Sequence, residues 1–517
     1  MAKQLKNHSS VSSPLIRSGT KSKSLADHLD ELPPSATRRT LLSNWAGFAF
    51  TFAGQGGDAG IAGSGDPWQN WTSLTNKLVR RITFGITAQE SKRAAQIGFL
   101  AYLEEQLNPG AIHEQALEST IVKRWPRTTW QPPQLYGIND DWISTDHLVQ
   151  STVFRAVKSR KQLQEKMVEL WCDHFNMWAD KAWGGQLITC VRDVIRPNAL
   201  TNFPTLLRGV LGHPSMLIYL DNVYNYGDFP NINFAREILE LHTVSVTGGY
   251  TTTDIKNLAR ALTGWSVDDG SVSQANKGRF QYRSYYHSVG QKSVMGHAIP
   301  MGQQSEGEDI IAWLGMHPKT AEFIAKKLVA RFVSHTPDPT LVQQVANVYL
   351  STGGDIKSML RVVLSPLVIQ SAPAKLKRPF HLAVSGLRTN ESHIHDMGFL
   401  RWFYLPYMGQ VPFNWEPPDG YPDRIDYWAA STLQRLQFGY GLANNEVWGI
   451  DYQPKDRWDS LTADQALTMI NNGLFGGEAS NQDRTSINNF LVSRPLTEVR
   501  LRAAYAIALA SPSFQYY

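Results

Sequence analysis

The stretch that decides the fold is Asn231–Trp265, which reads NINFAREILELHTVSVTGGYTTTDIKNLARALTGW. Its apolar residues recur at helical spacing on both sides of a double-glycine turn, which predicts amphipathic helices over 232–243 and 252–262. Asn231 can cap the first helix with its side-chain oxygen, and Thr251–Thr253 can cap the second. The stretch therefore predicts a mainly α fold.

The first of these helices carries the candidate catalytic residues Arg236, Glu237 and Glu240. Arg236 and Glu240 are four residues apart and Glu237 and Glu240 three apart, so each pair shares a helix surface. An Arg236–Glu240 ion pair is the simpler interpretation, because buried charges persist when they are paired. His242 lies on a different side of an ideal helix, so it joins these groups only if the helix ends at that point.

A second histidine lies on the helix predicted over 163–178, LQEKMVELWCDHFNMW. His174 shares one face with large apolar side chains, where a histidine is usually a core residue hydrogen-bonded to a carbonyl. Polar residues nevertheless crowd the same helix end: Asp173, Asn176, Asp180 and Lys181. We therefore take His174, Glu237 and His242 as a candidate ligand set for a divalent metal ion, or as groups for proton transfer. Mixed histidine and carboxylate ligands would suit zinc, iron or manganese.

The amino-terminal part of the chain predicts two segments that precede the folded domain. Residues 1–37 are rich in serine, lysine and proline, and we expect them to be disordered. Residues 38–65 begin with Arg38-Arg39 and continue with a short apolar stretch and a glycine-rich run, which resembles a twin-arginine export signal and its linker. This pattern predicts a periplasmic or secreted protein; the alternative is a basic tail on a cytoplasmic one.

Residues 66–517 are expected to form one large helical domain. Strand-like alternation with glycines predicts a small β-hairpin inserted near 270–300. Residues 108–145 are rich in proline and aromatic residues, which predicts a long ordered loop. No segment of the domain is long and apolar enough to span a membrane.

Composition excludes several classes of function. The net charge of +5 over 517 residues is too small to indicate a nucleic-acid partner. Short basic clusters such as Lys375, Lys377 and Arg378 are interpreted as a solvent-exposed face. Cys172 and Cys190 form no disulfide framework or C-x-x-C motif, and two separate buried thiols are favoured over a bridge between them. The chain also lacks an HExxH helix, a GxSxG elbow, a P-loop and a dinucleotide fingerprint.

Several motifs in collinear order resemble those of one bacterial family, catalogued as domain of unknown function 1800. The resemblance runs from about residue 70 to the carboxyl end. It is carried by the segments ITFG (82–85), DHFN (173–176), RDVIRPNAL (192–200), HPSMLIYLDN (213–222), FAREILELHT (234–243), GGYT (248–251), ARALTGW (259–265), KRPF (377–380) and PPDGYP (417–422). The resemblance implies a mostly helical, often exported bacterial protein without a settled activity. It also implies a partner, an exported sulfatase-like protein encoded nearby.

The chain departs from the family pattern at three places. Cys172 stands where relatives often carry a histidine, and Ser288 follows His287 where an aspartate is usual. Leu367-Val368 replaces an acidic and aromatic pair. Roles that depend on those partners are not expected in this chain.

Two hypotheses about function follow. The first is an exported, metal-dependent enzyme, an oxidoreductase or hydrolase, that acts on a cell-surface or polymeric substrate. The second is a non-catalytic exported scaffold for a partner protein or glycan, which the 16 tryptophans and 19 tyrosines favour. The enzyme hypothesis predicts that His174, Glu237 and His242 meet in one pocket, whereas the scaffold hypothesis predicts dispersed charges and an exposed aromatic patch.

Overall fold

The central stretch folds into the two predicted helices, but the first changes its geometry halfway. In the computed structural model, which describes residues 71–227, 229–271, 273–452 and 461–517, this stretch comprises α16 (Ile232–Glu237), the π-helix η5 (Ile238–His242) and α17 (Thr252–Ala261). Asn231 caps α16, and Thr251 with Asp254 forms a capping box on α17. The hydroxyl of Thr243 donates to the Ile238 carbonyl at 2.6 Å and closes the wider π turn.

Helices make up most of the described chain before this stretch. In chain order they are α4 (Leu74–Ile82), α5 (Ala88–Ile97), α6 (Phe99–Leu107), α7 (Gln115–Arg124), α8 (Pro132–Leu135), α9 (Asp141–Lys158), α10 (Gln162–His174), α11 (Ala179–Ala182), α12 (Gly184–Thr189), the π-helix η3 (Cys190–Ile195), α13 (Arg196–Asn198), α14 (Phe203–Leu211) and α15 (Pro214–Tyr219). The expectation of a long loop over 108–145 is wrong, because α7 and the start of α9 lie within it.

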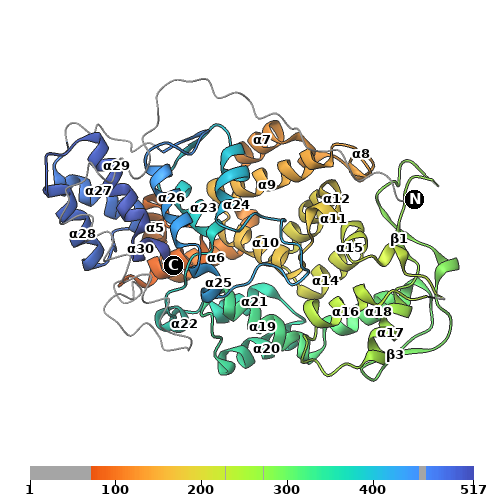
Figure 1. The fold of residues 1–517 in the computed structure, drawn as a ribbon. Coiled ribbons are helices and arrows are strands. Elements are labelled where there is room, and N and C mark those ends of the chain that lie inside the picture. Colours follow the sequence, from red (N-terminus) through yellow and green to blue (C-terminus); the bar gives the residue numbers. More distant parts are fainter. Residues whose placement is uncertain (1–70, 228, 272, 453–460) are drawn as a thin grey trace. The chain divides into compact units, whose positions relative to one another are not determined.

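The chain after the central stretch is also mainly helical. Its helices are α18 (Gln304–Gly315), α19 (Pro318–Phe332), α20 (Pro339–Thr352), α21 (Ile356–Val363), α22 (Pro366–Ser371), α23 (Pro379–Thr389), the π-helix η7 (Leu400–Tyr404), α24 (Leu405–Tyr407), α25 (Ile425–Ala429), α26 (Thr432–Ala443), α27 (Ala463–Phe475), α28 (Asn481–Val492), α29 (Glu498–Ala510) and α30 (Pro512–Gln515). Figure 1 shows α19, α20 and α21 side by side, and α26 packs against α29.

Strands are few and short, and all pair antiparallel. The predicted hairpin near 270–300 is confirmed as two small sheets, which pair β1 (Trp265–Val267) with β2 (Phe280–Tyr282) and β3 (Lys292–Val294) with β4 (His297–Ile299). A third pair that the sequence did not predict joins β5 (His393–Ile394) to β6 (Ile450–Asp451). The prediction of a mainly α fold with a small β insertion is therefore confirmed.

The helix α10 supplies the framework of the site. It packs against α4, α6, α9 and η3, and buries Leu163, Met167 and Trp171 completely. The helix ends at His174, four residues earlier than the sequence pattern predicts. The predicted tail at 1–37 and the predicted signal at 38–65 lie outside the described residues. Among the helices that the structure describes, none combines the length and apolarity required to cross a membrane.

Candidate functional site

The two predicted histidine ligands meet in the core, where each binds the other's backbone. His174 closes α10 and His242 closes η5, so the expected helix end at residue 242 is confirmed. The His174 Nε2–H donates to the His242 carbonyl at 3.2 Å, and the His242 Nδ1–H donates to the His174 carbonyl at 3.1 Å. We call this reciprocal pair the histidine clasp. Its two hydrogen bonds fix the tautomer of each ring.

The clasp lies among aromatic rings, and both imidazoles are neutral. Trp171, Phe175 and Phe203 pack around His174. Burial, reinforced by the positive charge of Lys327, lowers the pKa of His174 well below its usual value and that of His242 to about 3. The remaining nitrogens, His174 Nδ1 and His242 Nε2, accept no hydrogen bond within the described chain. These features are those of core histidines.

The structure does not bring Glu237 into this pair. In the described segments, no group of three or more histidine, cysteine, aspartate or glutamate side chains is arranged to hold a metal ion. Each imidazole donates its N–H to a carbonyl, and its other nitrogen lies in an apolar environment, so the candidate ligand set does not fit a metal here. Glu237 is half-buried; burial and then the neighbouring Glu240 raise its pKa.

Arg236 and Glu240 are not paired either. Arg236 is exposed, and the described residues contain no ion pair between it and Glu240. The Glu240 carboxylate instead faces Tyr250, where burial and then this carboxylate raise the pKa of the phenol to about 12. The ion pair that the four-residue spacing of Arg236 and Glu240 predicts is therefore absent from the described residues.

A lysine that the sequence analysis did not single out lies beside the clasp. Lys327 on α19 is half-buried, with its ammonium 5.0 Å from the centre of the Phe323 ring. Its Nζ makes no hydrogen bond or ion pair within the part of the chain that the structure describes. Burial lowers its pKa to about 8, although the charges of Asp173 and Asp419 oppose that shift.

The two carboxylates near Lys327 come from different segments. Asp173 is on α10, next to the clasp, and its Oδ2 accepts a hydrogen bond from Arg378 Nη1 at 2.7 Å. Burial raises the pKa of Asp173, and Arg378 opposes that effect. Asp419 is exposed on the loop 412–423, where the Trp415 indole donates to it at 2.9 Å. Glu237 also lies within electrostatic reach of Asp419.

The loop 412–423 is tied to the end of α10 by backbone acceptors. The Asn176 amide donates to the carbonyls of Trp415 at 2.8 Å and Pro417 at 2.7 Å. The Tyr219 hydroxyl donates to the Glu416 carbonyl at 2.5 Å. These bonds connect the DHFN and PPDGYP motifs in space, and they position Asp419 near Lys327.

Gly420 allows the loop to approach α10 closely, so we expect Gly420→Ala to destabilise this junction. Its φ is +76°, and a Cβ would lie 2.0 Å from the Asp173 carbonyl oxygen. Positive φ and a clash with backbone together should cost at least about 2 kcal/mol of unfolding free energy. Urea denaturation would measure the loss. Gly473→Ala is the matched control: it lies in α27 with open space around its Cβ, and should stabilise by about 0.5–1 kcal/mol.

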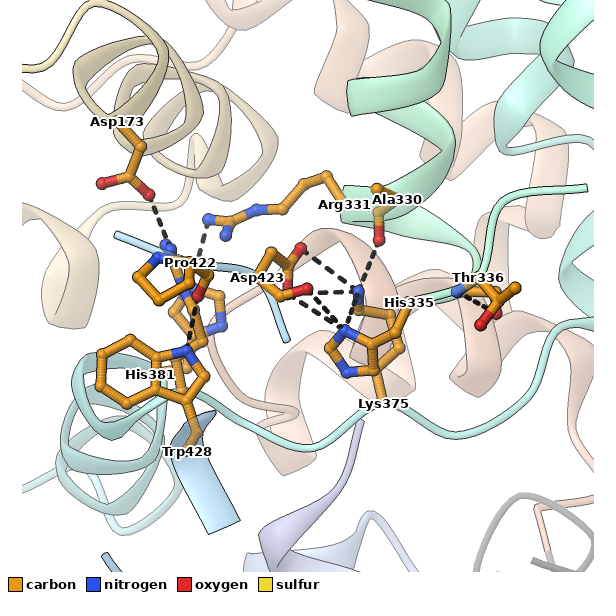
Figure 2. Close-up of polar contacts among 12 residues, drawn as sticks. Asp173, Ala330, Arg331, His335, Thr336, Lys375, His381, Pro422, Asp423 and Trp428 are labelled. Carbon is orange, nitrogen blue, oxygen red and sulfur yellow. Dashed lines mark hydrogen bonds and ion pairs between the residues drawn. The ribbon is translucent and has the colours of Figure 1, made fainter. Parts of the chain in front are cut away.

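Behind Asp173 lies a network of buried ions. Arg378 bridges Asp173 and Glu169, and Glu169 also pairs with Arg331 and His381. Figure 2 shows Asp173, Arg331 and His381 at one end of this network. The side chains of Arg331 and Arg378 are each 2% exposed. Burial acts to raise the pKa of Glu169, but the positive charges of Arg331 and then Arg378 hold it well below its usual value.

A third carboxylate, Asp423, lies within electrostatic reach of Arg378. Lys375 Nζ and His335 Nδ1 each lie 3.3 Å from one of its oxygens. Figure 2 marks these contacts with dashed lines. Lys375, Lys377 and Arg378 are buried, so the interpretation of this basic cluster as a solvent-exposed face is wrong. Lys375 and Arg378 pair with carboxylates far away in sequence, which the local pattern cannot reveal, and Lys377 Nζ donates to the hydroxyl of Ser385.

A small cavity of about 30 Å³ lies beside the contact between α10 and the loop. Asp173, Glu169 and Cys172 line it together with Phe84 and Phe380. This volume has room for one or two water molecules. Cys172 and Cys190 both carry free thiols, as favoured from the sequence, but Cys172 is only half-buried, whereas Cys190 is buried as predicted. Burial raises the pKa of Cys190 to about 12.

Comparison with known proteins gives a family but no activity. A family model described as "Protein of unknown function (DUF1800)" matches residues 77–516. No curated protein and no solved structure matches the chain. The matched range includes the clasp, Lys327, the loop 412–423 and the buried ion network. Because the match covers nearly the whole described chain, this protein belongs to the DUF1800 family of proteins of unknown function.

Proposed function

We propose that this chain is an exported enzyme that performs acid–base chemistry on a polar substrate where α10, α19 and the loop 412–423 meet. The observation that carries the proposal is the Lys327 amine, which forms no ion pair with any of the described residues although the carboxylates of Asp173 and Asp419 lie within electrostatic reach. Residues with perturbed pKa values gather at functional sites more often than elsewhere.

The groups present suit proton transfer near neutral pH. A lysine whose pKa is about 8 is largely protonated at pH 7 and gives up its proton more easily than an ordinary lysine. Asp173 can accept a proton, and Arg378 fixes the orientation of its carboxylate. Glu237 adds a half-buried carboxylate on the side of Asp419. The proposed chemistry uses these side chains and routes no step through a metal ion.

Location and partners belong to the same proposal. The resemblance of 38–65 to a twin-arginine signal supports export to the periplasm or beyond, and hence a cell-surface or polymeric substrate. The family resemblance supports an exported sulfatase-like partner encoded nearby. The weak net charge of +5 gives no reason to propose a nucleic-acid partner.

A second candidate function, binding without catalysis, is favoured by an exposed aromatic row on η7 and α24. The rings of Phe399 and Phe403 stack at 5.0 Å, and those of Phe403 and Tyr407 at 6.0 Å. Trp402 beside them is 58% exposed. Such a row suits a protein partner, because aromatic side chains dominate interface energetics. Loss of co-purification of the sulfatase-like protein on Trp402→Ala and Phe403→Ala would support this candidate.

The test of the enzyme proposal starts with the titration of Lys327. We expect its rate of acetylation by acetic anhydride, followed by peptide mass spectrometry, to titrate with a pKa near 8. The exposed neighbour Lys326 on the same helix is the control. If Lys327 titrates like Lys326, the proposal is wrong.

Activity then provides the second readout. For any polymer or cell-wall substrate that the parent protein turns over, Lys327→Met and Asp173→Asn should each lower kcat by about 10²–10⁴-fold. Lys326→Met should leave kcat unchanged. If both variants fold and keep the turnover of the parent protein, the active site lies elsewhere.

A further inference from the structure

We infer that a cleft between the carboxyl end of α6 and the start of α21 binds a uronate, a sugar that carries one carboxylate. The cleft has a volume of about 340 Å³, which is in the range of sites that hold small ligands. Gln164 lines it at the amino end of α10, whereas Asp173 lies at the other end of that helix. The inference therefore concerns a second site and does not depend on the proposed acid–base chemistry.

Lys357 supplies a positive charge to the wall of the cleft, and this charge has no counter-ion in the described chain. Its Nζ donates a hydrogen bond to Asn108 Oδ1 at 3.1 Å and forms no ion pair with any described residue. No acidic side chain of the described segments lines the cleft. Because an ammonium group has three N–H donors, two remain for an oxyanion. A ligand carboxylate can therefore accept a charge-assisted hydrogen bond from Lys357.

The next cation along α21 shows the contrast with a paired charge. Arg361 lies four residues after Lys357 and donates to both carboxylate oxygens of Glu104, at 2.7 and 2.9 Å. Glu104 and Asn108 are also four residues apart, at the end of α6, so each of them contacts one of the two cations. Glu104 neutralises Arg361, whereas the amide of Asn108 leaves the charge of Lys357 available. One available positive charge matches a monoanion such as a carboxylate better than a phosphate dianion.

The rest of the wall suits the hydroxyl groups and the ring of a sugar. The Gln164 Nε2–H donates to a backbone carbonyl at 3.3 Å, and its Oε1 accepts no hydrogen bond within the described chain, so it can accept from a ligand hydroxyl. The Thr201 hydroxyl donates within its own turn at 3.2 Å and can also accept. Apolar surface for the C–H groups of a sugar ring comes from Pro109, Pro197 and Leu200. Neutral hydrogen-bonding groups and small apolar faces beside one cation are what a uronate requires.

The experiment is isothermal titration calorimetry of the full-length protein at pH 7 with two matched sugars. D-Glucuronate carries the carboxylate, and D-glucuronamide replaces it with a neutral amide of nearly the same shape. We expect glucuronate to bind at least about tenfold more tightly, because the amide cannot form the charge-assisted hydrogen bond with Lys357. Equal affinity for the two sugars overturns the inference. So does the absence of any binding heat from glucuronate at about 20 mM, which is well above a millimolar Kd.

Lys357→Met locates the binding and tests the role of this charge. The variant should bind glucuronate and glucuronamide with affinities within about twofold of each other, because only the neutral contacts remain. Lys326→Met is the matched control: it removes an exposed lysine that does not line the cleft, and it should keep the preference of the parent protein. If Lys357→Met keeps the full preference for glucuronate, the carboxylate binds elsewhere and the inference is wrong.

Two further measurements test the position and the charge of the ligand without altering Lys357. Gln164→Glu keeps a hydrogen-bond acceptor and adds a negative charge to the wall of the cleft. Glucuronate should then bind at least about fivefold more weakly, while the affinity for glucuronamide changes by less than about twofold. An equal effect on both sugars would place the carboxylate away from this wall and overturn the inference. Glucose 6-phosphate is the dianionic probe, and if it binds the parent protein more tightly than glucuronate does, the assignment to a uronate is wrong.

Discussion

Lowering the pH from 7.5 to 5.0 will remove about 4 kcal/mol of unfolding free energy through the histidine clasp alone. Both clasp residues have a folded-state pKa below that of the unfolded chain, for which the usual value is about 6.5. The unfolded state therefore takes up protons first. Stability is complete above pH 6.5 and falls as the pH decreases toward the folded pKa, which is about 3 for His242. Each histidine contributes about 2 kcal/mol over this range.

Isosteric amides can keep the clasp and remove its titration. Glutamine at position 174 places an N–H near the position of Nε2, and asparagine at 242 places one near Nδ1. The double variant His174→Gln, His242→Asn should therefore lose about 4 kcal/mol less unfolding free energy between pH 7.5 and 5.0 than the parent. Urea denaturation at both pH values measures this difference. His113→Asn is the control, because His113 is exposed. An unchanged pH dependence in the double variant would mean that the clasp is not neutral in the folded protein.

The sequence predicted those parts of the fold that depend on local signals. The cap of α17 is one case, because Thr251 and Asp254 satisfy each other's backbone within four residues. The hairpin region near 270–300 is another, since alternation and glycines indicate turns directly. The loop expected over 108–145 was wrong because prolines and tryptophans flank α7 without interrupting it: its ten residues, Gln115–Arg124, contain no proline.

The site was predicted only where helical spacing alone could place residues. His174 and His242 were both singled out and do meet, but the π turn of η5 and the aromatic surroundings make them a structural clasp. Lys327 gave no signal, because it lies at the edge of the apolar face of α19 like many surface lysines. The burial of Arg378 depends on Glu169, which is far away in sequence. The burial of Lys375 depends on Asp423, which follows a turn-rich loop.

The Glu169 carboxylate at the centre of the ion network should be sensitive to substitution, because its side chain is only 11% exposed and pairs with buried cations. Glu169→Gln removes the shared partner of Arg331, Arg378 and His381, which are all buried. Arg378 keeps Asp173, but Arg331 keeps no carboxylate partner within the described residues. Leaving a buried guanidinium without its counter-charge typically costs about 3–5 kcal/mol. We expect a loss of that size in urea denaturation at pH 7.5.

Matched variants distinguish a buried charge from the substitution itself. Glu104→Gln makes the same change in an ion pair with Arg361 whose side chains are 46% and 45% exposed, and should cost less than about 1 kcal/mol. Adding Arg331→Met to Glu169→Gln removes the unpaired cation together with its partner, so the double variant should recover part of the loss. A double variant no more stable than Glu169→Gln would show that the penalty comes from packing around Glu169. Recovery would show that this network holds α10 in place by charge compensation, and thereby fixes Asp173 beside Lys327.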